Sequence, residues 1–534
     1  MARVSIGLAA ALCLALGASA VAEPERPNIV LIMVDDMGYS DIGCYGGEIE
    51  TPNLDSLAAE GVRFTQFHNS GRCCPTRASL MTGLHPHQVG IGHMTESPEK
   101  RRTDGPGPYQ GYLDQDCATI AEVLRSAGYH TLMTGKWHLG FNDRETWPTQ
   151  RGFDEFYGCL AGAVNYFKPG GGRFIYRDDE VVKTPKDWYA TDAFTDEAIR
   201  YIDGAKAAED KPFFLYLAYN APHWPLNAKW EDYQKYRGRY REGWHALMER
   251  RQAKQRAIGL FGEDVTPAPH KGPKWDSLSA DEQDRLDSVM AAYAGCIDSI
   301  DQNIGKLLAH LESIGERENT VIFFLSDNGS CHEGGILGRG DEAMIRTPPL
   351  ETTGGVRLGT AWCLASNTPF RLHKTRTHEG GACTPMIAAW PAGVNPSLRG
   401  GFVRDVAHLQ DFMATAIDLS GTSYPEGLPA HQGKPLTRLL TASAADPARA
   451  KPLHPEPMYW EHSKTGAMRW GDWKLVRDQR HRWELYHMPT DRTELNNLAA
   501  ERPERYRQMI QMWEAWATEN GVRFDKAPRR RKAG

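Results

Sequence analysis

The chain has 534 residues, of which 41% are hydrophobic and 24% charged, the balance of an ordinary folded protein rather than a disordered polymer. Its 62 Lys and Arg against 68 Asp and Glu give a net charge of −6. That charge argues against a nucleic-acid-binding protein, because such proteins concentrate positive charge against phosphates. Beyond the amino terminus no run of about 18 apolar residues occurs, which excludes a multi-span membrane protein.

Residues 1–22 have the pattern of a secretory signal peptide. Arg3 precedes an apolar segment, 6–16, that is too short to span a bilayer, and small residues of the AxA type follow in 18–22. We therefore expect an exported protein, periplasmic or secreted, without a stable membrane anchor. Nine of the ten cysteines would remain after cleavage, and an odd number in an exported protein requires an explanation for one thiol.

Short apolar runs that end in polar residues predict buried strands. The runs 28–34, 212–218 and 320–325 are rich in Val, Ile and Phe and lack polar alternation, which is typical of parallel strands covered on both faces. Helical patterns lie between them, and the clearest places apolar residues three and four apart from Leu286 to Leu311. The sequence thus predicts an α/β domain with a large, mostly parallel sheet flanked by helices.

After about residue 440 the pattern changes. Four short strand-like segments precede a helix predicted over 503–520, so we expect a smaller α+β domain of antiparallel sheet plus helix. The predicted domains are 23–440 and 441–534. Residues 228–285 are polar with interspersed aromatics, and we interpret them as a surface insertion whose Trp230, like Trp224, either stacks on sugar rings or packs internally.

Acidic and amide residues follow two of the predicted strands. Asp35 and Asp36 come after the first, and Asp327 and Asn328 after the run 320–325. In open parallel sheets ligands bind beyond the carboxyl ends of the strands, so these distant pairs could converge on one crevice. Each pair alone would more often be a cap or a turn.

The segment Gly71–Gly83 is the most informative one. Pro75 is suited to the start of a helix, which places Cys73 and Cys74 at the helix N-terminus. Unpaired amides and the helix dipole favour negative charge there, and Arg77 lies one turn further on. Considered alone, the spacing would also fit a buried cysteine pair beside a helix cap.

The same segment fits the pattern CxPxRxxLxTG at all its fixed positions, which are Cys73, Pro75, Arg77, Leu80, Thr82 and Gly83. It resembles the signature of the type I sulfatases, arylsulfatase-like enzymes of the alkaline phosphatase superfamily. The resemblance implies that a separate maturation enzyme oxidises Cys73 to Cα-formylglycine, whose aldehyde hydrate attacks the sulfur of a sulfate ester. Conversion of Cys73 would also leave an even number of thiols.

Further blocks similar to that family follow in the same order along the chain. They imply a divalent cation, Ca²⁺ with Mg²⁺ as the alternative, bound by Asp35, Asp36, Asp327 and Asn328. The GKWHLG block implies that Lys136 binds a sulfate oxygen and that His138 hydrogen-bonds the hydrate.

Two later residues complete the implied site. The segment APHWP implies that His223 contacts sulfate and the leaving oxygen, and Lys374 before EGG matches the second sulfate-binding lysine. Arg77 would stabilise the charge of the reacting group, and Asp327 would accept the proton of the hydrate. His223 or Lys374 would protonate the leaving oxygen.

The sequence therefore predicts an exported hydrolase of sulfate monoesters, acting on aryl sulfates and on a sulfated carbohydrate. The nearest alternative is a phosphodiester or phosphonate monoester hydrolase of the same superfamily, because phosphoryl and sulfuryl groups require similar metals and cations. The other alternative is a catalytically inactive glycan-binding relative. Against that alternative, a chemically competent residue occupies each matched motif position.

Overall fold

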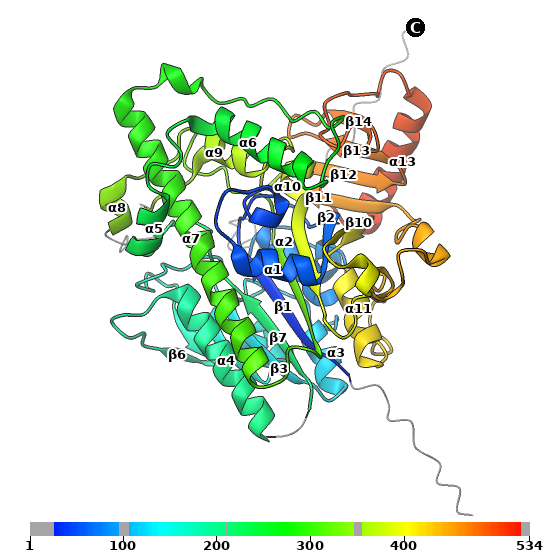
Figure 1. Ribbon diagram of the computed structural model, residues 1–534. Coiled ribbons are helices and arrows are strands. Elements are labelled where there is room, and N and C mark those ends of the chain that lie inside the picture. The colour runs from blue at the N-terminus through cyan, green and yellow to red at the C-terminus, as the bar shows by residue number, and fades with distance from the viewer. Residues whose placement is uncertain (1–25, 96–105, 209–210, 347–354, 525–534) are drawn as a thin grey trace, which may run out of the picture.

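A computed structural model describes residues 26–95, 106–208, 211–346 and 355–524 (Figure 1). The predicted signal peptide and the basic residues at the carboxyl end lie outside the described residues. Within the described residues, no helix combines the length and the apolar character needed to cross a membrane.

A ten-stranded sheet forms the centre of the protein, in the order β10-β2-β9-β8-β1-β7-β3-β4-β5-β6. Its strands are β1 (Asn28–Val34), β2 (Val62–His68), β3 (His130–Lys136), β4 (Glu155–Cys159), β5 (Ile175–Arg177), β6 (Glu180–Val182), β7 (Phe213–Ala218), β8 (Thr320–Ser326), β9 (Cys383–Ala389) and β10 (Gly401–His408). The pairs β10-β2, β8-β1, β1-β7, β7-β3 and β3-β4 are parallel, and β9 and the β5-β6 edge are antiparallel. The predicted mostly parallel sheet is confirmed.

Helices cover both faces of this sheet. They are α1 (Pro52–Glu60), α2 (Cys73–Thr82), α3 (Ile120–Ser126), α4 (Ala190–Ala208), α5 (Trp230–Tyr236), α6 (Gly243–Ala257), α7 (Ala280–Ser313), α8 (Glu342–Arg346), α9 (Gly359–Ser366), α10 (Glu379–Ala382), α11 (Asp411–Ser420) and α12 (Thr437–Thr441). Side chains of β1 alternate between two cores, with Val30 and Ile32 in one and Ile29 and Leu31 in the other. This double burial explains the unbroken apolar run.

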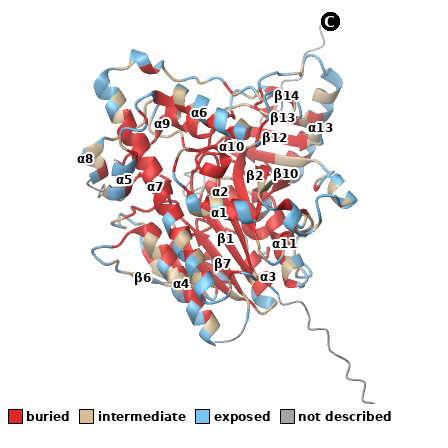
Figure 2. Cartoon of the chain, in the orientation of Figure 1, coloured by how far each residue is buried: buried red, intermediate tan, exposed pale blue. Residues whose placement is uncertain are grey.

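The longest helix, α7, matches the predicted apolar stripe. Its side chains from Leu286 to Leu311 include a continuous buried face (Figure 2). Ser279 caps the helix by accepting a hydrogen bond from the backbone amide of Glu282. The helix packs against α1, α4 and α5, so it is a core-facing helix of this domain.

A second sheet lies near the carboxyl end, built from β11 (Met458–His462), β12 (Thr465–Trp470), β13 (Trp473–Arg477) and β14 (Trp483–His487). It is antiparallel throughout, and α13 (Pro503–Glu519) covers it with Trp513 and Trp516. The predicted antiparallel sheet and helix are confirmed, with element ends within two residues of those expected.

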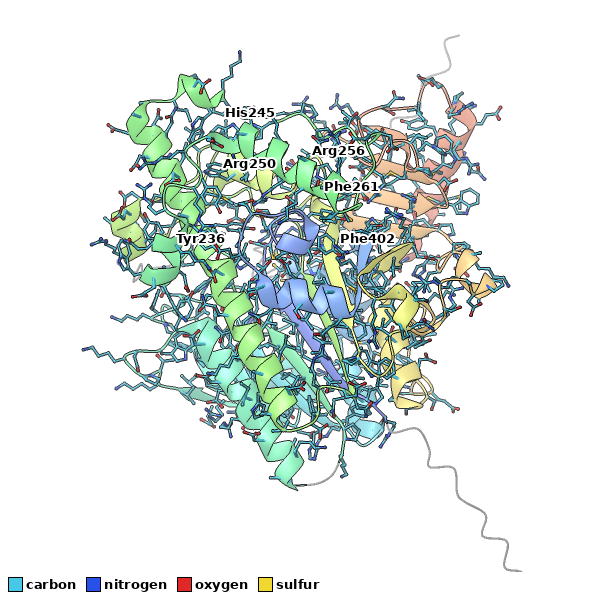
Figure 3. The ribbon with its side chains drawn as sticks, in the orientation of Figure 1. Tyr236, His245, Arg250, Arg256, Phe261 and Phe402 are labelled. Carbon is cyan, nitrogen blue, oxygen red and sulfur yellow. The ribbon has the colours of Figure 1, made fainter. Side chains whose placement is uncertain are left out.

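The expectation of a surface insertion at 228–285 is wrong for most of its aromatic residues. The segment forms α5 and α6, and the buried aromatic side chains are Tyr233, Tyr236, Tyr240 and Trp244. The exposed residues of α6 include His245 and Arg250 (Figure 3). The polar composition therefore reflects the outer face of amphipathic helices whose inner face packs against α7 and α9.

A buried ionic network joins the two sheets. Glu379 of α10 accepts hydrogen bonds from Lys474 of β13 and from Arg492, both at 2.6 Å, and lies 3.1 Å from Nε2 of His68 on β2. Lys474 also binds Glu494 at 2.8 Å. Burial raises the pKa of Glu379, but Lys474 and Arg492 outweigh burial and hold that pKa well below its usual range. The carboxylate is therefore ionised and is the shared partner of both cations.

We expect Glu379→Ala to lower the free energy of unfolding by about 3–5 kcal/mol, because it leaves Arg492 buried without its carboxylate and removes one of the two carboxylates that Lys474 binds. Denaturant unfolding of both proteins measures the difference. Glu312→Ala, at an exposed position of α7, is the control and should change stability by less than about 0.5 kcal/mol. Equal stability of the two variants would contradict a structural role for the network.

Candidate active site

The two acidic pairs meet because their strands are neighbours. β1 and β8 pair in parallel with Val34 opposite Ser326, so the residues that follow each strand leave the sheet side by side. Asp35, Asp36, Asp327 and Asn328 are all buried. The backbone amide of Asp36 donates to Oδ1 of Asp327 at 3.2 Å, which fixes one pair against the other.

The backbone is strained at this site. Asp36 has a φ of 72° and His138 a φ of 63°, so both occupy the left-handed region, which residues other than glycine rarely adopt. Such conformations persist where the surrounding structure determines them, and they concentrate at functional sites. Here they turn two of the predicted site residues out of the strand direction.

Three buried cations compensate the three carboxylates. Lys136 at the end of β3 donates to Asp35 at 2.6 Å, and Lys374 lies 2.7 Å from Oδ1 of Asp36. Arg77 of α2 donates to Asp327 at 3.0 Å. Each of these six side chains is at most 1% exposed. The carboxylates thus remain paired in a water-excluded crevice, where an unpaired charge would be costly.

The pKa values follow from burial and from these partners. Burial raises the pKa of Asp36, but Lys374 and His223 outweigh it and lower that pKa to about 2. Burial, with the charge of Asp35, raises the pKa of Asp327 well above its usual range. The site therefore contains one firmly ionised carboxylate and one that readily holds a proton.

Two oxygen atoms of the crevice have no hydrogen-bond partner among the described residues. They are Oδ1 of Asp35 and Oδ1 of Asn328, both buried. Carboxylate and amide oxygens are the ligands that Ca²⁺ and Mg²⁺ prefer, and buried polar atoms normally have partners. The donor set therefore fits a hard divalent cation.

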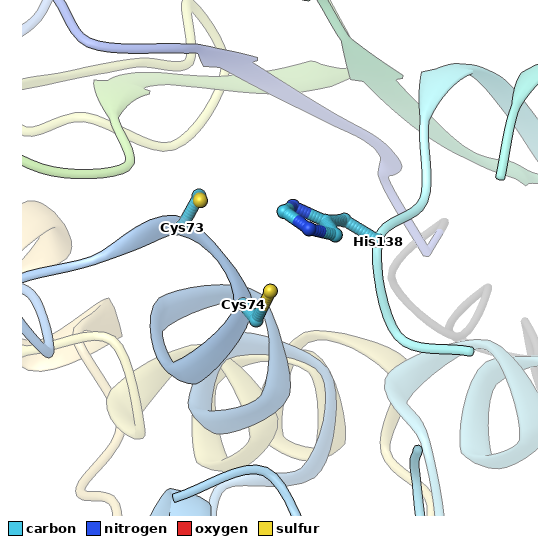
Figure 4. Close-up of side chains that lie close together, drawn as sticks. All are labelled: Cys73, Cys74 and His138. Atoms are coloured by element: carbon cyan, nitrogen blue, oxygen red, sulfur yellow. The ribbon is translucent and has the colours of Figure 1, made fainter. Parts of the chain in front are cut away.

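Cys73 is the first residue of α2. The helix therefore begins two residues before Pro75, whereas the sequence suggested a start at Pro75. Proline is tolerated in the third position because the amides of the first turn have no acceptor within the helix. Cys73 and Cys74 lie beside His138, with a ligand atom of each within 4.8 Å of the others (Figure 4). A hydrogen bond from Cys74 lowers the pKa of the Cys73 thiol, and Lys136 and His138 lower it further against the effect of burial.

His223 approaches the crevice from the loop after β7. Its Nε2 lies 3.5 Å from Oδ2 of Asp36, and its Nδ1 lies 2.6 Å from the carbonyl oxygen of Trp224. An N–H at Nδ1 would bond that carbonyl and leave Nε2 facing the site. Burial lowers the pKa of His223 to about 4, so the ring is neutral at neutral pH.

The structure brings together all the residues that the sequence analysis selected as a site. They are Asp35, Asp36, Cys73, Arg77, Lys136, His138, His223, Asp327, Asn328 and Lys374. A ligand atom of Cys73 lies within 4.8 Å of ligand atoms of Asp35 and Asp327. The predicted nucleophile, the predicted cation ligands and the cationic side chains thus share one crevice at the carboxyl ends of the strands.

Sequence reasoning missed two neighbours of this site. Tyr216 of β7 accepts a hydrogen bond from Arg77 at 3.1 Å, and Met94 places its sulfur 4.0 Å from that of Cys73. Tyr216 lies inside an apolar strand whose pattern is that of a core residue, so nothing local distinguishes it. Met94 comes from a loop whose packing depends on the whole fold.

This fold, with Cys73 at a helix N-terminus beside the buried acidic residues, is that of the hydrolases of the alkaline phosphatase superfamily. The sulfatase family model matches residues 27–422, and the chain belongs to that family. An uncharacterized sulfatase of Schizosaccharomyces pombe is 33% identical over 94% of this chain and 95% of its own. The arylsulfatase of Klebsiella aerogenes is 34% identical over 73% of this chain and 86% of its own.

Solved structures agree with this assignment. Ps i-CgsB has a TM-score of 0.66 and 27% identity, over 93% of this chain and 94% of its own, and a second structure holds it with k-i-k-neocarrahexaose. The resemblance to the sulfatases is thereby confirmed, and the chain is a sulfuric ester hydrolase by family. The conversion of Cys73, the cation and the role of each residue belong to the proposal below.

If the four oxygen-bearing residues bind Ca²⁺, adding it to metal-free protein should raise the melting temperature by about 2 °C or more, since a ligand that binds only the folded state stabilises it. Differential scanning calorimetry with and without Ca²⁺ measures this increment. Asp36→Asn should remove most of it. Asp281→Asn, at an exposed position in the first turn of α7, should retain it. An undiminished increment in Asp36→Asn would place the ion elsewhere.

Proposed function

We propose that the protein hydrolyses sulfate monoesters, with Cys73 converted to Cα-formylglycine as the nucleophile and a divalent cation held by Asp35, Asp36, Asp327 and Asn328. One observation carries the proposal. Cys73 begins a helix inside a buried crevice, and ligand atoms of Asp35, Asp327 and His138 lie within 4.8 Å of its sulfur. That is the position a nucleophile needs for attack on an anionic ester.

Two groups would be added to the folded chain, a formylglycine at position 73 and a divalent cation. When bound, a hydrated aldehyde at position 73 supplies a hydroxyl nucleophile, and Ca²⁺ or Mg²⁺ supplies positive charge that favours its ionised form and withdraws charge from sulfate. The unpartnered oxygens of Asp35 and Asn328 support the presence of the cation.

Lys136 and Lys374 bind the sulfate oxygens in this proposal. Each ammonium group has three N–H donors, so it can hold its aspartate and a sulfate oxygen at once. Burial and pairing keep both charged, because Asp35 and Asp36 raise the pKa of the lysines above the ordinary value in spite of burial. Fixed positive charge in a dry crevice stabilises the negative charge that develops as the ester bond breaks.

Five side chains handle protons or hold the groups that do. Asp327, which has a carboxylate oxygen within 4.8 Å of the Cys73 sulfur, accepts the proton of the attacking hydroxyl, and Arg77 orients that carboxylate. His223 takes up a proton at Nε2 when the anionic ester binds, because the negative charge of the ester favours the charged ring, and it then protonates the leaving oxygen. Lys374, which is already protonated, is the alternative donor. His138 would accept a proton from a hydrated aldehyde at position 73, which is the proton transfer that release of sulfate requires.

We propose aryl sulfates and a sulfated carbohydrate as substrates, by analogy with the arylsulfatase relative and with the oligosaccharide bound to Ps i-CgsB. Trp224 and Trp230 offer little to a sugar ring, since Arg357 covers a face of the first at 4.0 Å and Arg346 a face of the second at 3.9 Å. The proposal includes export to the periplasm or medium and encounter with a formylglycine-generating maturation enzyme.

Mass spectrometry of the peptide that contains Cys73 should show the aldehyde in active protein. We expect Cys73→Ala to reduce turnover of 4-nitrophenyl sulfate by at least about 10³-fold with the melting temperature nearly unchanged, because no other nucleophile occupies that position. Cys74→Ala is the matched control and should stay within about tenfold of wild type. An intact thiol in a fully active preparation would overturn the mechanism.

His223→Gln should affect substrates according to their leaving groups. A phenolate such as 4-nitrophenolate needs little protonation, so kcat should fall less than about tenfold, whereas for an alkyl sulfate it should fall about 10²–10⁴-fold. Turnover of a series of aryl and alkyl sulfates measures this dependence, and the matching phosphate and phosphonate esters test the alternative reaction class. A uniform loss across the series would mean that His223 binds sulfate without donating a proton.

A further inference from the structure

Three segments of the catalytic domain meet just outside the sulfate pocket. The amide of Thr375 donates to the carbonyl of Gly71 at 2.8 Å, and the amide of Lys374 donates to the carbonyl of Ser330 at 3.2 Å. His332 and His373 stack with ring centroids 4.0 Å apart. Arg72 and Arg376, which we call the outer cation cluster, therefore lie around Lys374 and next to Cys73, beside the ring of His332.

The charges of this cluster act on one another. Burial lowers the pKa of His332 to about 4, and among its charged neighbours Glu333 opposes this shift while Arg376, Lys374 and Arg72 add to it. All of these cations are therefore close to one ring. Positive charge is thus gathered at the entrance of a site whose substrate is an anion.

Arg376 is the member of the cluster that lacks a partner. It is half-buried, yet its guanidinium makes no hydrogen bond and no ion pair within the described part of the chain. Burial lowers its pKa, and Asp478, the carboxylate that opposes the shift, already accepts two hydrogen bonds from Arg482. An arginine held in this way lacks acceptors that it would normally have.

Arg72 is only weakly compensated. Its nearest carboxylate, on Glu333, is 3.8 Å away, and its Nε is buried without a partner, as is Nδ1 of His332. Two arginines buried elsewhere in the described structure pair closely with carboxylates, Arg251 with Asp41 at 2.6 Å and Arg492 with Glu379 at 2.6 Å. Arg376 differs from both of these arginines, because its guanidinium pairs with no carboxylate among the described residues.

We propose that the outer cation cluster is a second anion subsite, which binds a further sulfate or carboxylate group of the same substrate. The guanidinium fork of Arg376 matches two oxygens of either group, and Arg72 and His332 add donors. The natural substrate is then a polyanionic glycan whose second acidic group lies near the scissile ester. The proposal rests on the proposed function, because it takes Lys136 and Lys374 to hold the scissile sulfate.

Binding to the full-length Cys73→Ala protein tests the subsite without turnover. Three probes of similar size avoid any dependence on the sugar: phenyl sulfate, 1,3-phenylene disulfate and 3-carboxyphenyl sulfate. We expect calorimetry to show at least about tenfold tighter binding of a dianionic probe than of phenyl sulfate, as a charge-assisted hydrogen bond would give. The probe that gains affinity identifies the second group as sulfate or carboxylate.

Variants in the same background locate the effect. Adding Arg376→Ala should reduce the advantage of the dianionic probe to less than about twofold, and Arg376→Lys should retain part of it. Arg250→Ala, at an exposed position on α6, should leave it unchanged (Figure 3). An advantage that persists in Arg376→Ala, or an equal loss for phenyl sulfate, would overturn the proposal.

Turnover of 4-nitrophenyl sulfate by the wild-type protein separates the two proposals. If turnover occurs but dianionic probes gain nothing from Arg376, the subsite is wrong and the proposed function stands. If the Arg376-dependent advantage is present without turnover, the anion subsite stands and the proposed function is wrong.

Discussion

The site depends on the parallel pairing of β1 with β8. The register that sets Val34 opposite Ser326 makes Asp35, Asp36, Asp327 and Asn328 emerge together at one end of the sheet. A slip of one residue would move each of these side chains to the other side of the strand. The apolar residues of β1 fix the register, because both faces of the strand are buried between helices. Hydrophobic packing thus determines where the charged chemistry is placed.

Placing three carboxylates in a dry crevice requires compensation, and the fold draws it from three different elements. Lys136 comes from the end of β3, Arg77 from α2, and Lys374 from the loop before α10. With all six side chains ionised the formal charge is zero. A divalent cation would raise that charge to +2, and an anionic ester would reduce it again. The charge balance therefore links binding of the cation to binding of the sulfate.

Much of the fold was predictable because its signals are local. The apolar runs of β1 and β8, the stripe of α7 and the four short strands of the second sheet each carry their own periodicity. The inner site was predictable because its residues lie in motifs at strand ends and at a helix start. These signals require no knowledge of the rest of the chain.

The parts that could not be predicted depend on long-range packing. Tyr233 and Trp244 lie in a polar stretch, and only their contacts in the folded protein show that they are core residues. The same limit applies to Tyr216, whose hydroxyl binds Arg77 from the middle of an apolar strand. Arg376 could not be predicted for a different reason: it is one of 62 Lys and Arg residues, and nothing in the sequence around it sets it apart.

What distinguishes Arg376 is the lack of an acceptor within the described structure, a property that only the three-dimensional arrangement reveals.

The net charge of −6 does not show where the positive charges lie. A protein with an excess of acidic residues would be expected to repel a polyanion. Salt screens each charge over about 10 Å, however, so the electrostatic field that an approaching ligand meets is set by the charges nearest to the site. There Arg72 and Arg376 lie beside a pocket whose lysines are already balanced by aspartates. Lys136 and Lys374 are paired with aspartates of the site, whereas Arg72 and Arg376 have no comparable carboxylate partner among the described residues. The proposed outer subsite would therefore select between sulfate esters without a change in the inner residues.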